Sequence, residues 1–238
     1  MITLGVFMLE DFKSFLVGHL TKALVVDLED RLRAEAVKAH EMVRNHAGLN
    51  KKRSRELEGH ARFRMMEEGF EAVCKQHGGA TLHDGVIPLT ELKVFQPFSR
   101  FGREGRGVIL GLAAMPEPQK LPNRNMSRSA GVSLNYYLTP RLELDDAGPR
   151  VGDIFVLLLV ARDRARAGKI EEIAIGVVDS GYSFFLFYET LDKFLAGGED
   201  APTSAPDPTP LGVKLKRSPK PFVPPEQQPK KDDDTGAV

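Results

Sequence analysis

Three residues stand in an order that could support hydrolysis of a phosphodiester bond. Asp84 is followed by Glu91 and Lys93, which gives an acid and then an acid-x-lysine triplet. Two carboxylates can hold Mg²⁺, the metal can stabilise developing phosphate charge, and a lysine can help to activate water. Two acid-x-lysine triplets are expected by chance in this composition, and two occur, the other being Asp11-Phe12-Lys13.

These residues define one hypothesis for the function. Nucleases of the PD-(D/E)xK type combine Asp, Asp or Glu, and Lys in this way, so a Mg²⁺-dependent nuclease using Asp84, Glu91 and Lys93 is an alternative function. Mg²⁺ would be its cofactor. Outside this alternative we expect no cofactor, because a zinc site built on Cys74, His77 and His83 lacks the paired cysteines and the fourth ligand that such sites favour.

Charge is distributed unevenly along a chain whose formal net charge is zero. Residues 1–47 carry six basic and seven acidic side chains, residues 48–141 carry fifteen and nine, and residues 142–238 carry twelve and seventeen. The middle of the chain is therefore basic. Its first cluster comprises Lys51, Lys52, Arg53, Arg55, Arg62 and Arg64. A second runs from Arg100 to Arg128.

The basic middle predicts contact with nucleic acid. Cations bind phosphates by releasing counterions, and phenylalanines such as Phe95, Phe98 and Phe101 offer rings on which bases stack. The predicted contact residues are Arg53, Arg55, Arg100, Arg103, Arg106, Arg124 and Arg128. Two alternatives stay open: the arginines neutralise the acidic last third of the chain, or they bind a protein or a phosphorylated small molecule.

Apolar runs predict the strands that would position these residues. Residues 154–161 form a short, β-branched run typical of a buried strand, and strands around 173–178 and 183–188 follow. The charged connection 162–169 is too short for a buried crossover, so the strands it joins should be antiparallel. Further strands are predicted at 91–95, 107–115 and 132–138, which gives about six, and a short helix at 191–196.

Helical periodicity covers the first third of the chain. Apolar residues recur at gaps of three and four over residues 9–46, and Ser54 is placed to cap a second helix that ends near His77. The stripe from Val25 to Val43 is compatible with a coiled coil, although Glu35 interrupts it. Packing of this helix on its own domain is the simpler interpretation.

Helices first and strands later predict an α+β fold with a mainly antiparallel sheet. The domain organisation is an N-terminal helical region at 1–50, an α+β domain at 51–198, and a disordered tail at 199–238. Nine of the sixteen prolines lie in that tail. A loop of fifteen residues, 116–130, interrupts the sheet and is long enough to serve a function.

The sequence therefore predicts a non-enzymatic, cytoplasmic binding or accessory protein that contacts nucleic acid. A single cysteine fits a reducing compartment, and the apolar N-terminus lacks the basic stretch of a signal peptide, so no membrane anchor is expected. A third hypothesis is a self-assembling scaffold, in which the N-terminal helices form a homo-oligomer and the proline-rich tail recruits a protein partner.

Overall fold

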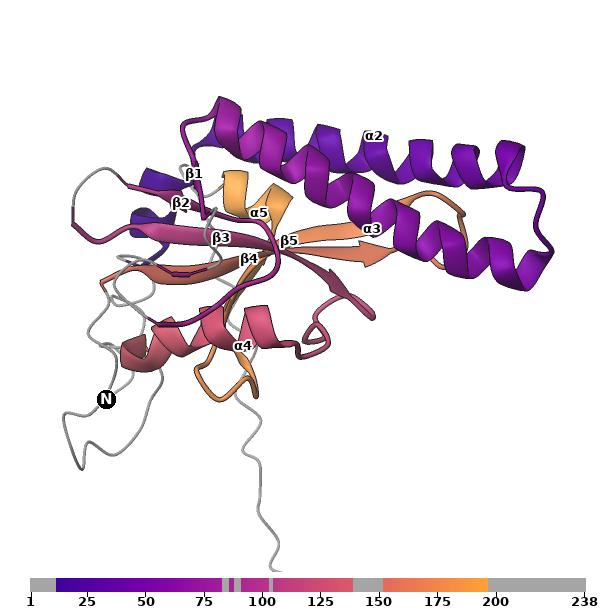
Figure 1. The fold of residues 1–238 in the computed structure, drawn as a ribbon. Helices are drawn as coiled ribbons and strands as arrows, with labels where there is room; N and C mark the ends of the chain where they lie inside the picture. Colours follow the sequence, from indigo (N-terminus) through magenta and orange to yellow (C-terminus); the bar gives the residue numbers. More distant parts are fainter. Residues whose placement is uncertain (1–11, 83–85, 88–90, 103–104, 139–151, 197–238) are drawn as a thin grey trace, which may run out of the picture. The chain divides into compact units, whose positions relative to one another are not determined.

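Six strands form one sheet whose spatial order follows the chain (Figure 1). They are β1 Ala80–Thr81, β2 Phe98–Phe101, β3 Val108–Met115, β4 Ile154–Arg162, β5 Ile170–Val178 and β6 Phe185–Thr190. The computed structural model describes residues 12–82, 86–87, 91–102, 105–138 and 152–196. Within them, helices precede a mixed sheet in which four of the five neighbouring pairs are antiparallel. The predicted α+β fold is confirmed.

The exception is the central pair, since β3 and β4 run parallel over their whole length. A parallel pair needs a crossover connection. Here that connection contains helix α4, Met126–Ser133, and the 3₁₀ helix η1, Leu134–Leu138. The parallel arrangement places the carboxyl ends of β3 and β4 at the same edge of the sheet.

Both faces of the sheet are apolar. Successive side chains of β3, β4 and β5 point to opposite faces and enter two separate cores. On β4, Val156 and Leu158 point into one core with α2 and α3, whereas Phe155 and Leu157 point into a second core with α4 and η1. All four are completely buried. Both cores explain why the central strands read as continuous apolar runs in the sequence.

The first core is covered by a helical hairpin of α2, Lys22–His46, and α3, Lys51–Gln76 (Figure 1). Side chains cap both helices: Thr21 Oγ1 accepts the N–H of Leu24 and Asn50 Oδ1 accepts that of Arg53. The apolar stripe of α2 is buried inside this fold, from Leu24 to Val43. It therefore serves the core of its own domain.

Several predicted boundaries differ from the structure. The helix predicted from residue 9 is interrupted before Lys22, and residues 12–19 form a separate helical segment. The second helix begins at Lys51 instead of after Ser54 because Asn50 is the N-cap. The short helix α5, Leu191–Ala196, and the antiparallel β4–β5 hairpin are confirmed.

Two predicted strands are wrong. Residues 132–138 are helical, in α4 and η1, and residues 91–95 contribute only a single bridge between Lys93 and Val86. The short strands β1 and β2 take their places in the sheet. The predicted tail, 199–238, lies outside the described residues. Among the helices that are described, none has the length and apolar character needed to cross a membrane.

Candidate nucleic-acid interface

The loops that follow the parallel strands β3 and β4 meet at one edge of the sheet. Arg164, after β4, forms an ion pair of 3.0 Å with Glu117, after β3, and donates a hydrogen bond of 3.2 Å to the carbonyl of Pro116. Ligands of sheets with parallel strands commonly bind outside the carboxyl ends of those strands. The surface beyond the carboxyl ends of β3 and β4 is therefore a candidate binding site.

A bulge and a tight turn orient the arginines after β4. The pairing of β4 with β5 shifts register between Ala161 and Arg162, and such bulges commonly redirect a side chain. Beyond it, Asp163 Oδ1 accepts the backbone N–H groups of Ala165 and Arg166, and Oδ2 accepts Arg166 Nε at 2.6 Å. The hydrogen bond from the Arg166 backbone is the main reason that the pKa of Asp163 is lowered. The turn that carries Arg162 and Arg164 is thus internally braced.

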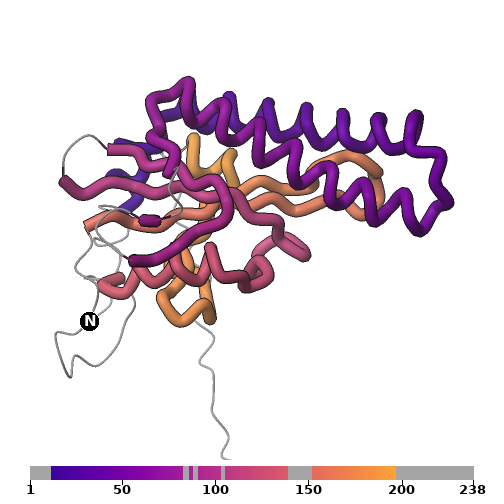
Figure 2. Tube along the Cα trace, viewed as in Figure 1, coloured from indigo at the N-terminus to yellow at the C-terminus, as the bar shows by residue number. Residues whose placement is uncertain are grey.

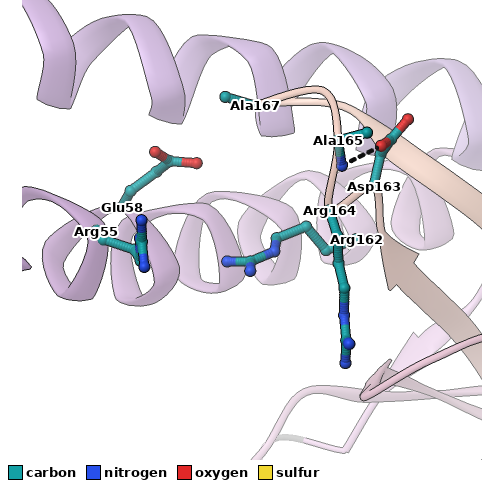
Figure 3. Close-up of a pocket in the computed structure, with 7 residues that line it drawn as sticks. All are labelled: Arg55, Glu58, Arg162, Asp163, Arg164, Ala165 and Ala167. Carbon is teal, nitrogen blue, oxygen red and sulfur yellow. Dashed lines mark hydrogen bonds between the residues drawn. The ribbon is translucent and has the colours of Figure 1, made fainter.

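Between this turn and α3 lies a hollow of about 450 Å³, hereafter the arginine hollow. Arg55 and Glu58 line it from α3, and Arg162, Asp163 and Arg164 line it from the turn. The guanidinium groups of Arg55 and Arg162 point toward one another across the space (Figure 3). Within the described part of the chain, neither group has a hydrogen-bond or ion-pair partner. The hollow therefore presents two guanidinium groups that no carboxylate of the described residues binds directly, although Glu58 and Asp163 also line it.

Glu58, which lines the hollow from α3, already contacts two basic side chains. Glu58 Oε2 lies 3.0 Å from His40 Nδ1, and its Oε1 lies 3.6 Å from Nη1 of the buried Arg62. Burial lowers the pKa of Arg62; Glu58 opposes this effect and Arg162 adds to it. The Nη1 atom has no hydrogen-bond partner among the described residues. Of these two charges, Glu58 has the larger effect on Arg62, so its carboxylate is engaged mainly by His40 and Arg62.

Close packing fixes the hollow between three elements. Figure 2 shows the β4–β5 turn lying against the end of the α2–α3 hairpin. Gly168 adopts a φ of +73° there, and a Cβ on it would lie 2.8 Å from Cβ of His40. His40 in turn contacts Glu58 on α3. The turn, α2 and α3 are therefore in direct contact around the site.

Four of the predicted contact arginines are exposed. Arg53 and Arg55 lie in the first turns of α3, beside Lys51 and Lys52. Arg106 lies over the ring of Phe15, with 5.1 Å from Cζ to the ring centroid. Arg124 lies 5.9 Å from the Tyr182 ring and donates to Ser129 Oγ. Of these four, the structure brings only Arg55 to the arginine hollow.

Of the other predicted residues, Arg100 is bound by groups of the protein itself, Arg128 is buried, and Arg103 is not among the described residues. Arg100 is bound to Asp153 and to the carbonyls of Gly102 and Gly105. Arg128 is 8% exposed, and burial lowers the pKa of its guanidinium. Arg103 lies outside the described residues. The contact of Arg100 with Asp153 is the kind of internal neutralisation that the first alternative predicted.

The three phenylalanines of the basic segment have different environments. Phe98 and Phe101 are core residues, with 0% and 6% of their surface exposed, whereas Phe95 is 73% exposed. Only Phe95 therefore offers a ring to a ligand.

The residues of the nuclease hypothesis are only partly placed. Glu91 and Lys93 are exposed before β2, and Asp84 lies outside the described residues, so their convergence stays a prediction. No group of three or more His, Cys, Asp or Glu side chains suited to a metal ion occurs among the residues that the structure places. Cys74 is buried, and His83 also falls outside the described ranges.

Sequence reasoning missed Arg162 and Arg164 as site residues. In the sequence they belong to the charged connection 162–169, and their partner in space, Arg55, is distant in the chain. The available signal was the alternation of Arg162, Arg164 and Arg166 in a connection of only eight residues, 162–169. Alternating positions favour arginines that share one side of a hairpin end.

Comparison with known proteins provides no further assignment. No protein-family model, no curated protein and no solved structure gives a significant match to this chain, so the site itself has to carry the functional argument.

Proposed function

We propose that this chain is a non-enzymatic binding protein that contacts the phosphate backbone of nucleic acid through the arginine hollow. The observation that carries the proposal is the pair Arg55 and Arg162, whose guanidinium groups point toward one another and have no hydrogen-bond or ion-pair partner among the described residues. Guanidinium groups bind phosphate oxygens through planar, paired hydrogen bonds. A phosphate is the ligand chemistry best matched to this pair.

The surroundings of the hollow favour an extended anion over a small one. Lys51 and Lys52 line a neighbouring depression together with Arg55 and one acid, Glu56. Arg53 is exposed on the same first turns of α3. Three cations around one depression suit a ligand with repeated phosphates, because each contact releases a counterion. Because the chain has no net charge, attraction by its overall charge cannot drive binding. Binding would depend on the local arrangement of these cationic side chains.

The test is fluorescence anisotropy of the full chain with labelled single- and double-stranded DNA and RNA across a salt series. We expect salt-sensitive binding by the wild-type protein. The double variant Arg55→Ala/Arg162→Ala should reduce the slope of log K against log salt by about 1.4–1.8, the amount expected for two phosphate contacts.

A matched control removes two arginines that already have acidic partners. Arg31 pairs with Glu35, and Arg33 pairs with Glu29, both on α2. The variant Arg31→Ala/Arg33→Ala changes the net charge equally and should keep the wild-type slope. Equal slopes for the wild type and the Arg55→Ala/Arg162→Ala variant, with both folded by circular dichroism, would reject the arginine hollow as the binding site.

A further inference from the structure

Two apolar side chains stand out on the surface near the loop after β3. Phe95 and Met126 are 73% and 75% exposed, the highest values among the large apolar residues that the structure describes. Their segments are in contact, because the N–H of Phe95 donates a hydrogen bond of 2.7 Å to Ser127 Oγ. A large exposed ring held by its backbone is a feature that core packing does not explain.

Polar contacts brace this surface against α3 and α4. Gln96 Nε2 donates to Glu67 Oε1 on α3 at 3.1 Å, and Gln96 Oε1 accepts Asn125 Nδ2 at 2.9 Å. Asn125 also caps α4 by accepting the N–H of Arg128. Glu67 is 5% exposed and is bound by Arg64 as well. Phe95 is therefore presented from a fixed backbone, at little further cost in conformational entropy.

Cationic residues lie near Phe95 in the chain or in the segments that contact it. Lys93 is exposed two residues before Phe95, and Arg124 is exposed two residues before Met126. The side chain of Arg64 is 77% exposed, although it is paired with Glu67. An exposed apolar ring with cationic residues in the neighbouring segments suits a ligand that combines a flat apolar face with negative charge. An unpaired nucleotide has this chemistry.

The same helix links this surface to the arginine hollow. Arg55 lies at the hollow, and Glu67 lies beside Gln96, twelve residues further along α3. That separation corresponds to about 18 Å along the helix axis. Successive nucleotides of one stacked nucleic-acid strand are about 3.4 Å apart along the axis, so this distance equals roughly five nucleotides. A strand of about five stacked nucleotides thus spans the axial distance from Arg55 to the turn of α3 that contacts Gln96, the neighbour of Phe95.

We infer that Phe95 is a stacking platform for an unpaired base, so that the nucleic acid bound by this chain is single-stranded. This inference rests on the proposed function and adds the class of partner. In a duplex the faces of the bases are covered by their neighbours, so the ring has nothing to stack on. Loss of the ring should weaken binding of a single strand roughly tenfold to a hundredfold.

The chain contains no tryptophan, which makes a direct test possible. Phe95→Trp places a single reporter at the platform, and Tyr137→Trp places one at a control position that is 56% exposed on η1. Each variant is titrated with a thymidine oligonucleotide of about 12 nucleotides and with a duplex of equal length. We expect quenching only for Phe95→Trp with the single strand, at the midpoint given by anisotropy. Phe95→Ala should weaken only single-strand binding.

The outcomes separate this inference from the proposed function. Salt-sensitive binding with unchanged Phe95→Trp emission, and wild-type affinity of Phe95→Ala, would overturn the stacking platform while leaving the arginine hollow in place. That result would point to a protein partner for Phe95 and Met126. No binding of any oligonucleotide by the wild type at the lowest salt would overturn the proposed function, and the platform with it.

Discussion

The guanidinium of Arg100 holds both carboxylate oxygens of Asp153, through Nε at 2.7 Å and Nη2 at 3.0 Å. Asp153 Oδ1 also accepts the N–H of Gly107. This arrangement ties the β2–β3 hairpin to the start of β4. The hydrogen bonding that Arg100 donates to the Asp153 carboxylate is the main reason that the pKa of Arg100 is raised.

Arg100→Ala should therefore reduce stability without changing nucleic-acid binding. It leaves a carboxylate that is 7% exposed without its charged partner, which we expect to cost about 2 kcal/mol. Urea denaturation measures the loss, and the anisotropy salt slope should stay at the wild-type value. A stable variant with a shallower slope would return Arg100 to the set of binding residues.

Two glycines should respond to alanine in opposite directions. A Cβ on Gly131 of α4 would lie 2.5 Å from ring atoms of Phe155, so Gly131→Ala forces either the helix or the ring to move. We expect a loss of about 1–3 kcal/mol. Gly59 of α3 has no atom within 4 Å of the added methyl group, and Gly59→Ala should stabilise the helix by about 0.5–1 kcal/mol.

Thermal and urea unfolding of both variants provide the measurement, with each serving as the control for the other. Destabilisation by both substitutions would mean that α3 does not tolerate a methyl group at position 59. Stabilisation by both would contradict the close packing of α4 on Phe155.

Cys74 should be nearly inert in the folded protein. Burial is the main cause that raises the pKa of its thiol to about 12. At pH 8 the reactive thiolate is then about a thousandfold scarcer than in the unfolded chain. Labelling with a disulfide reagent should be correspondingly slow until denaturant is added. Rapid labelling of the native protein would show that the thiol is accessible.

The same shift predicts a loss of stability in alkali. The unfolded thiol ionises near pH 9, whereas the folded thiol keeps its proton until about pH 12. The folded state thus binds more protons in this interval, so the free energy of unfolding falls as pH rises from 9 to 12. Cys74→Ala should flatten this decline, although the raised pKa values of Tyr182 and Tyr188 contribute in the same direction at higher pH.

Elements with strong periodicity could be predicted from the sequence, and those that depend on tertiary contacts could not. The strand at 154–161 and the helix ending near His77 follow from apolar patterns alone. Helix α4 contains Gly131 and three serines, a poor composition for a helix. Its stability comes from the Asn125 cap and from packing on Phe155, neither of which a local pattern reveals.

The candidate site was predicted only in part. The basic start of α3, including Arg55, was visible as a charge cluster. Arg162 was not, because its role depends on a bulge in β4 and on a helix that is distant in the chain. Arg100 and Arg128 were included among the contacts because charge counts cannot distinguish a solvated arginine from one that is paired or buried.

The parallel pairing of β3 with β4 has a consequence for the order of assembly. The other four neighbouring pairs of strands are antiparallel. Among them, the β4–β5 hairpin closes a particularly short loop. Joining β3 to β4 closes a far longer one, with α4 inside it, and long closures slow folding. We therefore expect β3 to join β4 late. The ion pair between Arg164 and Glu117 joins the loops after these two strands, so it cannot exist before that step. A partly folded chain with the β2–β3 and β4–β5 hairpins formed would therefore still lack the brace that holds the turn of Arg164 to the loop after β3.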